Sequence, residues 1–66
     1  MQIYINSEGK SIPDNTTMAS LIELLELAGQ RIAVEVNDEL VPRSTFEHHQ
    51  LQPDDKIEIV RAIGGG

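Results

Sequence analysis

The chain has 66 residues, no cysteine and a net charge of −6, from eleven acidic and five basic side chains. This length suffices for one small domain around a single core, and the absent thiol excludes disulfides and any side-chain thioester chemistry. The acidic balance argues against nucleic acid as a partner, because phosphate binding needs a basic surface, and it favours a basic protein surface instead.

The sequence also argues against a membrane protein. No stretch approaches the ~20 apolar residues that a membrane span requires. Met1 leads directly into strand-like sequence, without the pattern of a signal peptide. We therefore expect a soluble, cytoplasmic protein.

The first residues predict a β-hairpin. Residues 1–6 alternate apolar and polar side chains, as in a half-buried strand. Residues 7–9 predict a turn in which Gly9 supplies the permissive backbone. Residues 10–13 predict a second strand, which Pro13 confines to an edge of the sheet.

A helix is expected next. Capping residues at 14–17 precede it, and Gly29 is placed to end it as a left-handed C-cap. The apolar side chains that recur at helical spacing are Met18, Leu21, Ile22, Leu25 and Ala28.

The second half predicts three more strand segments. We expect strands at 31–37, 40–41 and 56–60, and turns at 37–39 and 53–55. Ile32, Val34, Val36, Ile57 and Ile59 should face the core. The segment from Ser44 to Glu47 has the S-x-x-E form of a capping box, which predicts a single helical turn there.

The order of these elements predicts the fold. A right-handed crossover that pairs the first and last strands in parallel would bury the helix on one sheet face. This is the α+β β-grasp, or ubiquitin-like, fold, with a mixed sheet of four to five strands packed on one helix. Residues 1–63 would form the single domain, and residues 64–66 a flexible C-terminal glycine tail.

The terminal residues Gly64, Gly65 and Gly66 are the strongest candidates for chemistry. A glycine run has no Cβ atoms, so it can thread a narrow channel and deliver only the α-carboxylate of Gly66. A carboxylate is a poor electrophile until it is converted to a mixed anhydride with AMP, for which a partner enzyme must supply the ATP site. The alternative is an idle end, since glycine runs are also common linkers.

Other constellations are weaker candidates. His48 and His49 are adjacent in sequence, which gives poor geometry for chelating one metal, and we expect them to be exposed loop residues. Val60 is out of phase with the inward side chains of the last strand, so it could be exposed and could form a docking surface beside the tail, or it could be buried by a barrel-like curl of the sheet. Glu58 could steer the tail toward a basic partner surface, although it could equally be a solvated side chain.

Several motifs resemble the ThiS family of sulfur carrier proteins, a ThiS/MoaD-like group with the ubiquitin fold. They are Val36-Asn37, Val41-Pro42-Arg43 with Phe46 three residues on, "KIEIV" and the terminal Gly-Gly. The chain departs from the family at Pro53-Asp54-Asp55, where Gly-Asp is usual, and at Phe46, where Trp is frequent.

The resemblance implies a carrier rather than an enzyme. An E1-like, ThiF-like adenylyltransferase would adenylate the Gly66 carboxylate with Mg-ATP, so the carrier itself would bind no cofactor. A persulfide protein would then convert the carboxylate to a thiocarboxylate, and a ThiG-like thiazole synthase would accept the sulfur for thiamin biosynthesis.

Three alternatives remain open. A MoaD-like carrier for molybdopterin synthesis would use the same chemistry. A ubiquitin-like modifier would join its last glycine to lysine. An acidic β-grasp adaptor would bind a basic partner without any tail chemistry.

Overall fold

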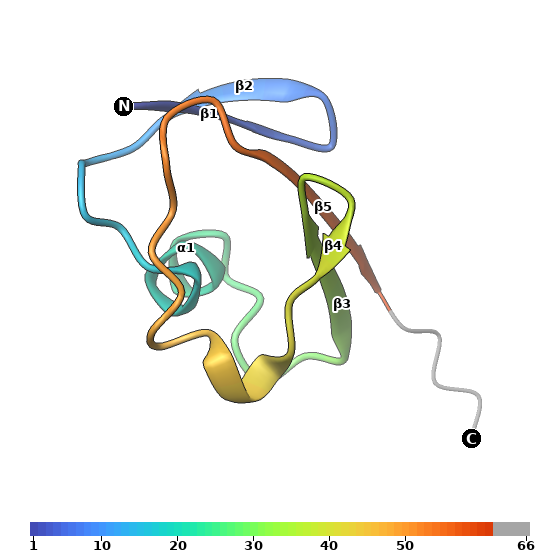
Figure 1. Ribbon diagram of the computed structural model, residues 1–66. Helices are drawn as coiled ribbons and strands as arrows, with labels where there is room; N and C mark the ends of the chain where they lie inside the picture. The colour runs from blue at the N-terminus through green and yellow to red at the C-terminus, as the bar shows by residue number, and fades with distance from the viewer. Residues whose placement is uncertain (62–66) are drawn as a thin grey trace.

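A five-stranded mixed sheet wraps around one helix in the computed structural model, which describes residues 1–61 (Figure 1). The elements are β1 (Gln2–Ile5), β2 (Glu8–Ser11), α1 (Met18–Leu24), β3 (Ile32–Val36), β4 (Glu39–Leu40), the 3₁₀ helix η1 (Arg43–Thr45) and β5 (Lys56–Arg61). The strand order is β2-β1-β5-β3-β4. β1 and β5 run parallel, and the other neighbours are antiparallel. The predicted β-grasp topology is therefore confirmed.

Both hairpins close through two-residue turns of left-handed backbone. Asn6 and Ser7 have φ of 49° and 73° between β1 and β2, and Asn37 and Asp38 have φ of 51° and 70° between β3 and β4. Two positive φ values match the right-handed twist of the flanking strands, and Asn and Asp tolerate them best among non-glycine residues. The first turn thus precedes the one predicted, and Gly9 lies within β2, paired with Tyr4.

Several predicted boundaries move by one or two residues. β2 runs over Glu8–Ser11 rather than 10–13, and β4 over Glu39–Leu40 rather than 40–41. A helical turn does form after β4, but it begins at Arg43 behind Pro42, and no side chain caps it. The capping box predicted at Ser44 is therefore wrong, because the N-cap position is taken by Pro42, two residues before Ser44.

Helix α1 is shorter than predicted. Thr17 caps its start, with the side-chain oxygen accepting from the Ser20 amide at 3.2 Å. At the other end Glu26 adopts φ of 60°, and the amides of Glu26 and Leu27 bond back to the carbonyls of Glu23 and Ile22. This is a Schellman ending, so Glu26 takes the left-handed position that the sequence assigned to Gly29. No helix within residues 1–61 is long and apolar enough to cross a membrane.

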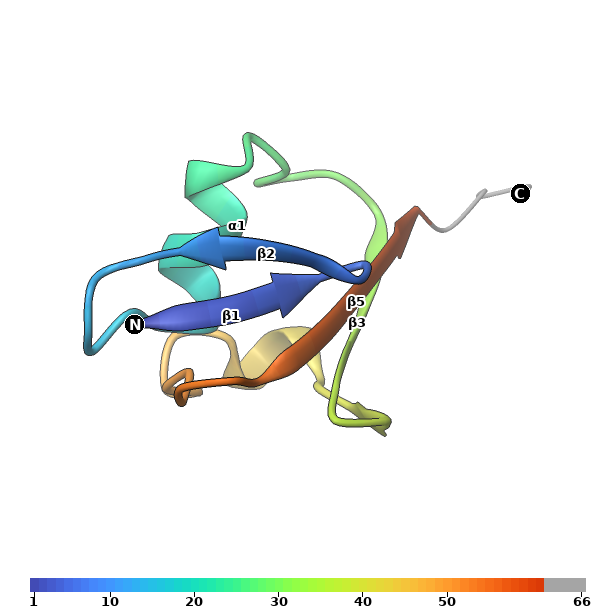
Figure 2. The ribbon, with the colours of Figure 1, turned by 90° about the horizontal axis from the view of Figure 1, so that it is seen from above.

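The core lies between the concave face of the sheet and α1, and the segment from η1 to β5 covers the remaining side (Figures 1 and 2). Its most buried side chains come from both the sheet and the helix: Ile3 and Ile57 lie on the sheet, and Met18 and Leu21 lie on α1. The inward phase predicted for β3 and β5 is confirmed. The buried apolar residues are Ile3, Ile12, Met18, Leu21, Ile22, Val34, Val36, Val41, Phe46, Leu51, Ile57 and Ile59.

Candidate functional site

The predicted tail, Gly64 to Gly66, lies outside the described residues, so its reactive role stays a prediction. The structure does describe the strand that leads to it. β5 lies between β1 and β3 in the sheet and is anchored on both sides. The chain therefore approaches the tail from the central strand of the sheet.

The side chain of Asn6 holds β5 two residues before its end. Its Oδ1 accepts from the Ile59 amide at 2.9 Å, and its Nδ2 donates to the Ile59 carbonyl at 3.2 Å. β1 itself pairs with β5 only at Tyr4 and Ile5. The side-chain amide of Asn6 thus adds one more hydrogen-bonded pair to the parallel β1–β5 ladder, beyond the end of β1.

A second asparagine holds the other end of β5. Asn37 donates its backbone amide to the Lys56 carbonyl at 2.7 Å, and its Oδ1 accepts from the Lys56 amide at 3.1 Å. Its Nδ2 donates to Asp55, whose other carboxylate oxygen accepts from the Gln52 amide. Asp55 is only 7% exposed, so these bonds compensate a carboxylate largely removed from water.

The face of the sheet away from α1 brings the predicted docking residues together. Val60 is 59% exposed and pairs with Ala33 on β3, and Glu58 pairs with Glu35. Leu40, 68% exposed, pairs with Glu35 from the other side. Directly opposed residues share a sheet face, so two exposed apolar side chains flank two carboxylates there. The expected exposure of Val60 is confirmed, and we call these residues the outer face: Ala33, Glu35, Leu40, Glu58 and Val60.

The Val41-Pro42-Arg43 motif has a structural role that the sequence alone did not reveal. Val41 and Phe46 are buried in the core, and Pro42 precedes η1. The Arg43 guanidinium donates to the Gln30 carbonyl in the loop between α1 and β3. The motif therefore connects η1, which follows β4, to the loop that precedes β3.

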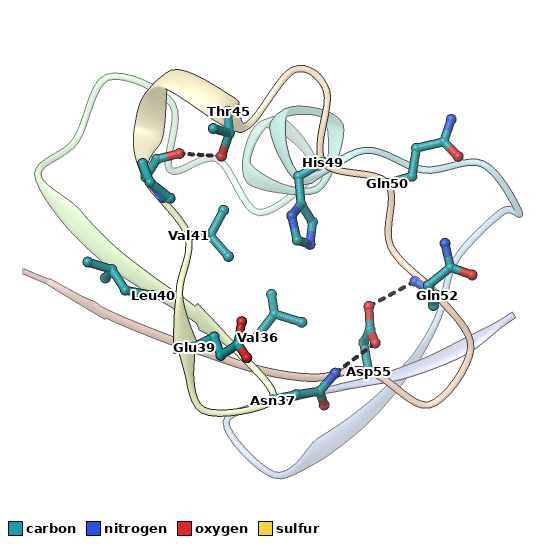
Figure 3. A pocket seen from close by; sticks show the side chains of 11 residues that line it. Val36, Asn37, Glu39, Leu40, Val41, Thr45, His49, Gln50, Gln52 and Asp55 are labelled. Carbon is teal, nitrogen blue, oxygen red and sulfur yellow. Dashed lines mark hydrogen bonds between the residues drawn. The ribbon is translucent and has the colours of Figure 1, made fainter.

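The two histidines differ in their surroundings. His48 is exposed as predicted, but His49 is half-buried and lines a cavity of about 450 Å³ between β4, η1 and the residues before β5. Its ring points toward the space between Val41, Val36 and Asp55 (Figure 3). The expectation of two exposed histidines is thus wrong for His49. Within residues 1–61 no three His, Asp or Glu side chains are grouped to hold a metal ion.

Comparison with known proteins decides the family. The ThiS family model matches residues 3–66, nearly the whole chain. The chain belongs to the ThiS family. This confirms the family resemblance drawn from the sequence.

The relatives of this chain differ in length. The sulfur carrier protein ThiS of Escherichia coli is 30% identical over 66 residues, and the alignment covers all of both chains. A thiazole synthase of Magnetococcus marinus is 41% identical over 66 residues, but the chain spans only 20% of its length. The crystal structure of the thiamine biosynthesis protein ThiS from Geobacter metallireducens superposes with a TM-score of 0.87 at 23% identity, covering all of both chains, and supports the fold.

Proposed function

We propose that this chain carries sulfur for thiazole formation in thiamin biosynthesis, acting in the cytoplasm through the carboxylate of Gly66. A ThiF-like adenylyltransferase, which binds the Mg-ATP, would let this carboxylate attack the α-phosphate of ATP and release pyrophosphate. A persulfide sulfur would then displace AMP, and thiol cleavage of the resulting acyl disulfide would leave a thiocarboxylate. The observation that carries the proposal is the family match, which extends through the last glycine.

The final acceptor proposed is a ThiG-like thiazole synthase. The 41% identical relative is named thiazole synthase, and the region like this chain makes up a fifth of it. A carrier-like segment and a synthase within one polypeptide support a working relationship between the two. A donor that must meet a synthase at every cycle would gain effective concentration from such a linkage.

The anchored β5 supports a role for Gly65 and Gly64 as the arm that threads the partner. Asn6 fixes the backbone at Ile59, seven residues before Gly66. A rigid base and side-chain-free terminal residues suit a substrate that must enter a closed catalytic site, because the fixed base reduces the entropy lost on binding.

The outer face is the proposed docking surface for the adenylyltransferase. Val60 and Leu40 supply exposed apolar area, and Glu58 and Glu35 lie directly opposite each other on neighbouring strands. Like charges in such positions destabilise a sheet, so a basic side chain of a partner between them would remove that cost. An apolar surface with Lys or Arg at its centre is therefore the complement that we expect.

Truncation tests the proposal. A chain without Gly66, and one with an alanine added after it, should lose AMP transfer and sulfur loading while keeping the melting temperature of the wild type. Both should still bind the adenylyltransferase within a few-fold of wild type, because the outer face is unchanged. An adaptor would lose nothing in either variant, and retained sulfur loading would contradict the carrier proposal.

A further inference from the structure

Three of the five basic residues gather where β5 ends. Arg61 is the last residue of β5 and lies opposite Ile32 on β3. Arg31 directly precedes Ile32, and the Arg43 guanidinium donates to the carbonyl of Gln30. Arg43 and Arg61 thus both meet the segment 30–32, which itself contains Arg31. The other two cations are elsewhere, with Lys10 on β2 and Lys56 at the opposite end of β5.

Within residues 1–61 these arginines form no ion pair. All three are exposed, and the one ion pair found within residues 1–61 joins the Met1 amino group to Asp14. Glu23 and Glu47 line a cavity together with Ile32 and Arg43, yet neither pairs with a guanidinium. In a chain of net charge −6, this end therefore presents unneutralised positive charge beside the start of the tail.

The length of the tail limits what the arginines can reach. Gly66 lies five residues beyond Arg61, and five extended residues span at most about 17 Å. Threading, as proposed above, requires an extended tail with its carboxylate at the α-phosphate of ATP. Arg61 would then lie at the entrance of the partner's channel, too far away to contact the nucleotide.

We propose that Arg31 and Arg61 bind carboxylates of Asp or Glu residues at the entrance of the channel in the adenylating partner, with Arg43 adding to the local positive charge. This inference rests on the proposed function and assigns the charge of the partner's surface. The channel entrance is acidic, whereas the surface that meets Glu35 and Glu58 is basic. Arginine suits the first contact because its planar fork bonds a carboxylate through two parallel hydrogen bonds.

Two contacts of opposite sign also fix the orientation of the carrier. The outer-face carboxylates and the arginines at the end of β5 form a charge pattern that fits a partner in one direction only. Docking with the tail pointing away would place like charges against each other, which electrostatic complementarity disfavours.

Charge reversal tests this inference. R31E and R61E should each lower kcat/KM for the carrier about tenfold with a ThiF-like adenylyltransferase that adenylates the wild-type chain, as expected for one lost charged contact. K10E makes the same change of charge on the far edge strand and should stay within about twofold. The KM for ATP should not change, and the losses should shrink at high salt because salt screens the contact. Melting temperatures identify any variant that fails to fold, and R31Q and R61Q, which remove the charge without reversing it, should then show smaller losses of the same kind.

The outcomes separate the two claims. If R31E and R61E behave like K10E while the wild type is adenylated, the acidic entrance is contradicted and the carrier function stands. A rise in KM for ATP would assign the arginines to the nucleotide and overturn the inference. If the wild-type chain is not adenylated at all, the proposed function fails and the inference fails with it.

Discussion

Asn6 and Ile59 are 53 residues apart in sequence, yet the side-chain amide of Asn6 pairs with both the amide and the carbonyl of Ile59. The pairing has the form of one further rung of the β1–β5 ladder, supplied by a side chain in place of a strand. It holds β5 close to the point where the tail begins.

Replacing Asn6 by glycine should lower the free energy of unfolding by about 1–3 kcal/mol, because two hydrogen bonds are lost. Glycine accepts the left-handed φ of 49°, so the loss reports the amide and not backbone strain. Asn6→Asp keeps the acceptor and should lie between glycine and wild type. Urea unfolding measures both, and a glycine variant as stable as wild type would show that the pairing contributes nothing.

Asp55 provides a second test of the anchoring of β5. Asp55→Asn puts an amide nitrogen against one of the two N–H donors, from the Asn37 side chain and the Gln52 backbone, and should cost about 1–3 kcal/mol because position 55 is buried. The neighbouring Asp54 is exposed, so Asp54→Asn makes the same change of charge and should stay within about 0.5 kcal/mol. Equal effects of the two substitutions in thermal unfolding would contradict the role given to Asp55.

Val60→Asp should weaken binding to the adenylyltransferase at least about tenfold while lowering the free energy of unfolding by less than about 1 kcal/mol. The reason is its exposure of 59% on the outer face. Leu24 is 57% exposed on α1, away from that face, and Leu24→Asp is the matched control that should bind like wild type. A large loss of stability in Val60→Asp would place the residue in the core and remove the argument for docking.

Alternation and helical spacing predicted most of the fold. The inward phases of β3 and β5 and the burial of Met18, Leu21 and Ile22 on α1 follow from the apolar pattern, and the parallel pairing of β1 with β5 follows from the order of the elements. Such patterns are local, and burial enforces them because a shift of one residue would expose the whole core side of a strand.

The residues that adopt left-handed backbone at the turns and at the helix end were less predictable. Gly9 and Gly29 were assigned the turn and the helix end, but Asn6, Ser7 and Glu26 adopt the left-handed conformations there. The strand register and the Schellman hydrogen bonds select those positions. Residues there adopt a positive φ although their own preference is mildly against it. Propensity alone cannot foresee this, because the compensating bonds come from the completed hairpin and helix.

The surroundings of the candidate site were the least visible in the sequence. The convergence of Arg31, Arg43 and Arg61 needs the β3–β5 register and the bond from Arg43 to Gln30. The position of His49 beside Val41 needs the path of the chain around η1. Both are consequences of long-range contacts. The sequence offered one hint of this convergence, because three of the five basic residues are arginines at, or within two residues of, an end of a predicted strand.

Intact-mass measurement of the wild-type chain, after incubation with the adenylyltransferase, ATP and a persulfide source, tests the central claim most directly. The account predicts a gain equal to the difference between one sulfur and one oxygen atom, located by fragmentation at Gly66 and absent when ATP is omitted. An unchanged mass under conditions in which the same enzyme loads a known carrier, or a modification located anywhere other than Gly66, would contradict it.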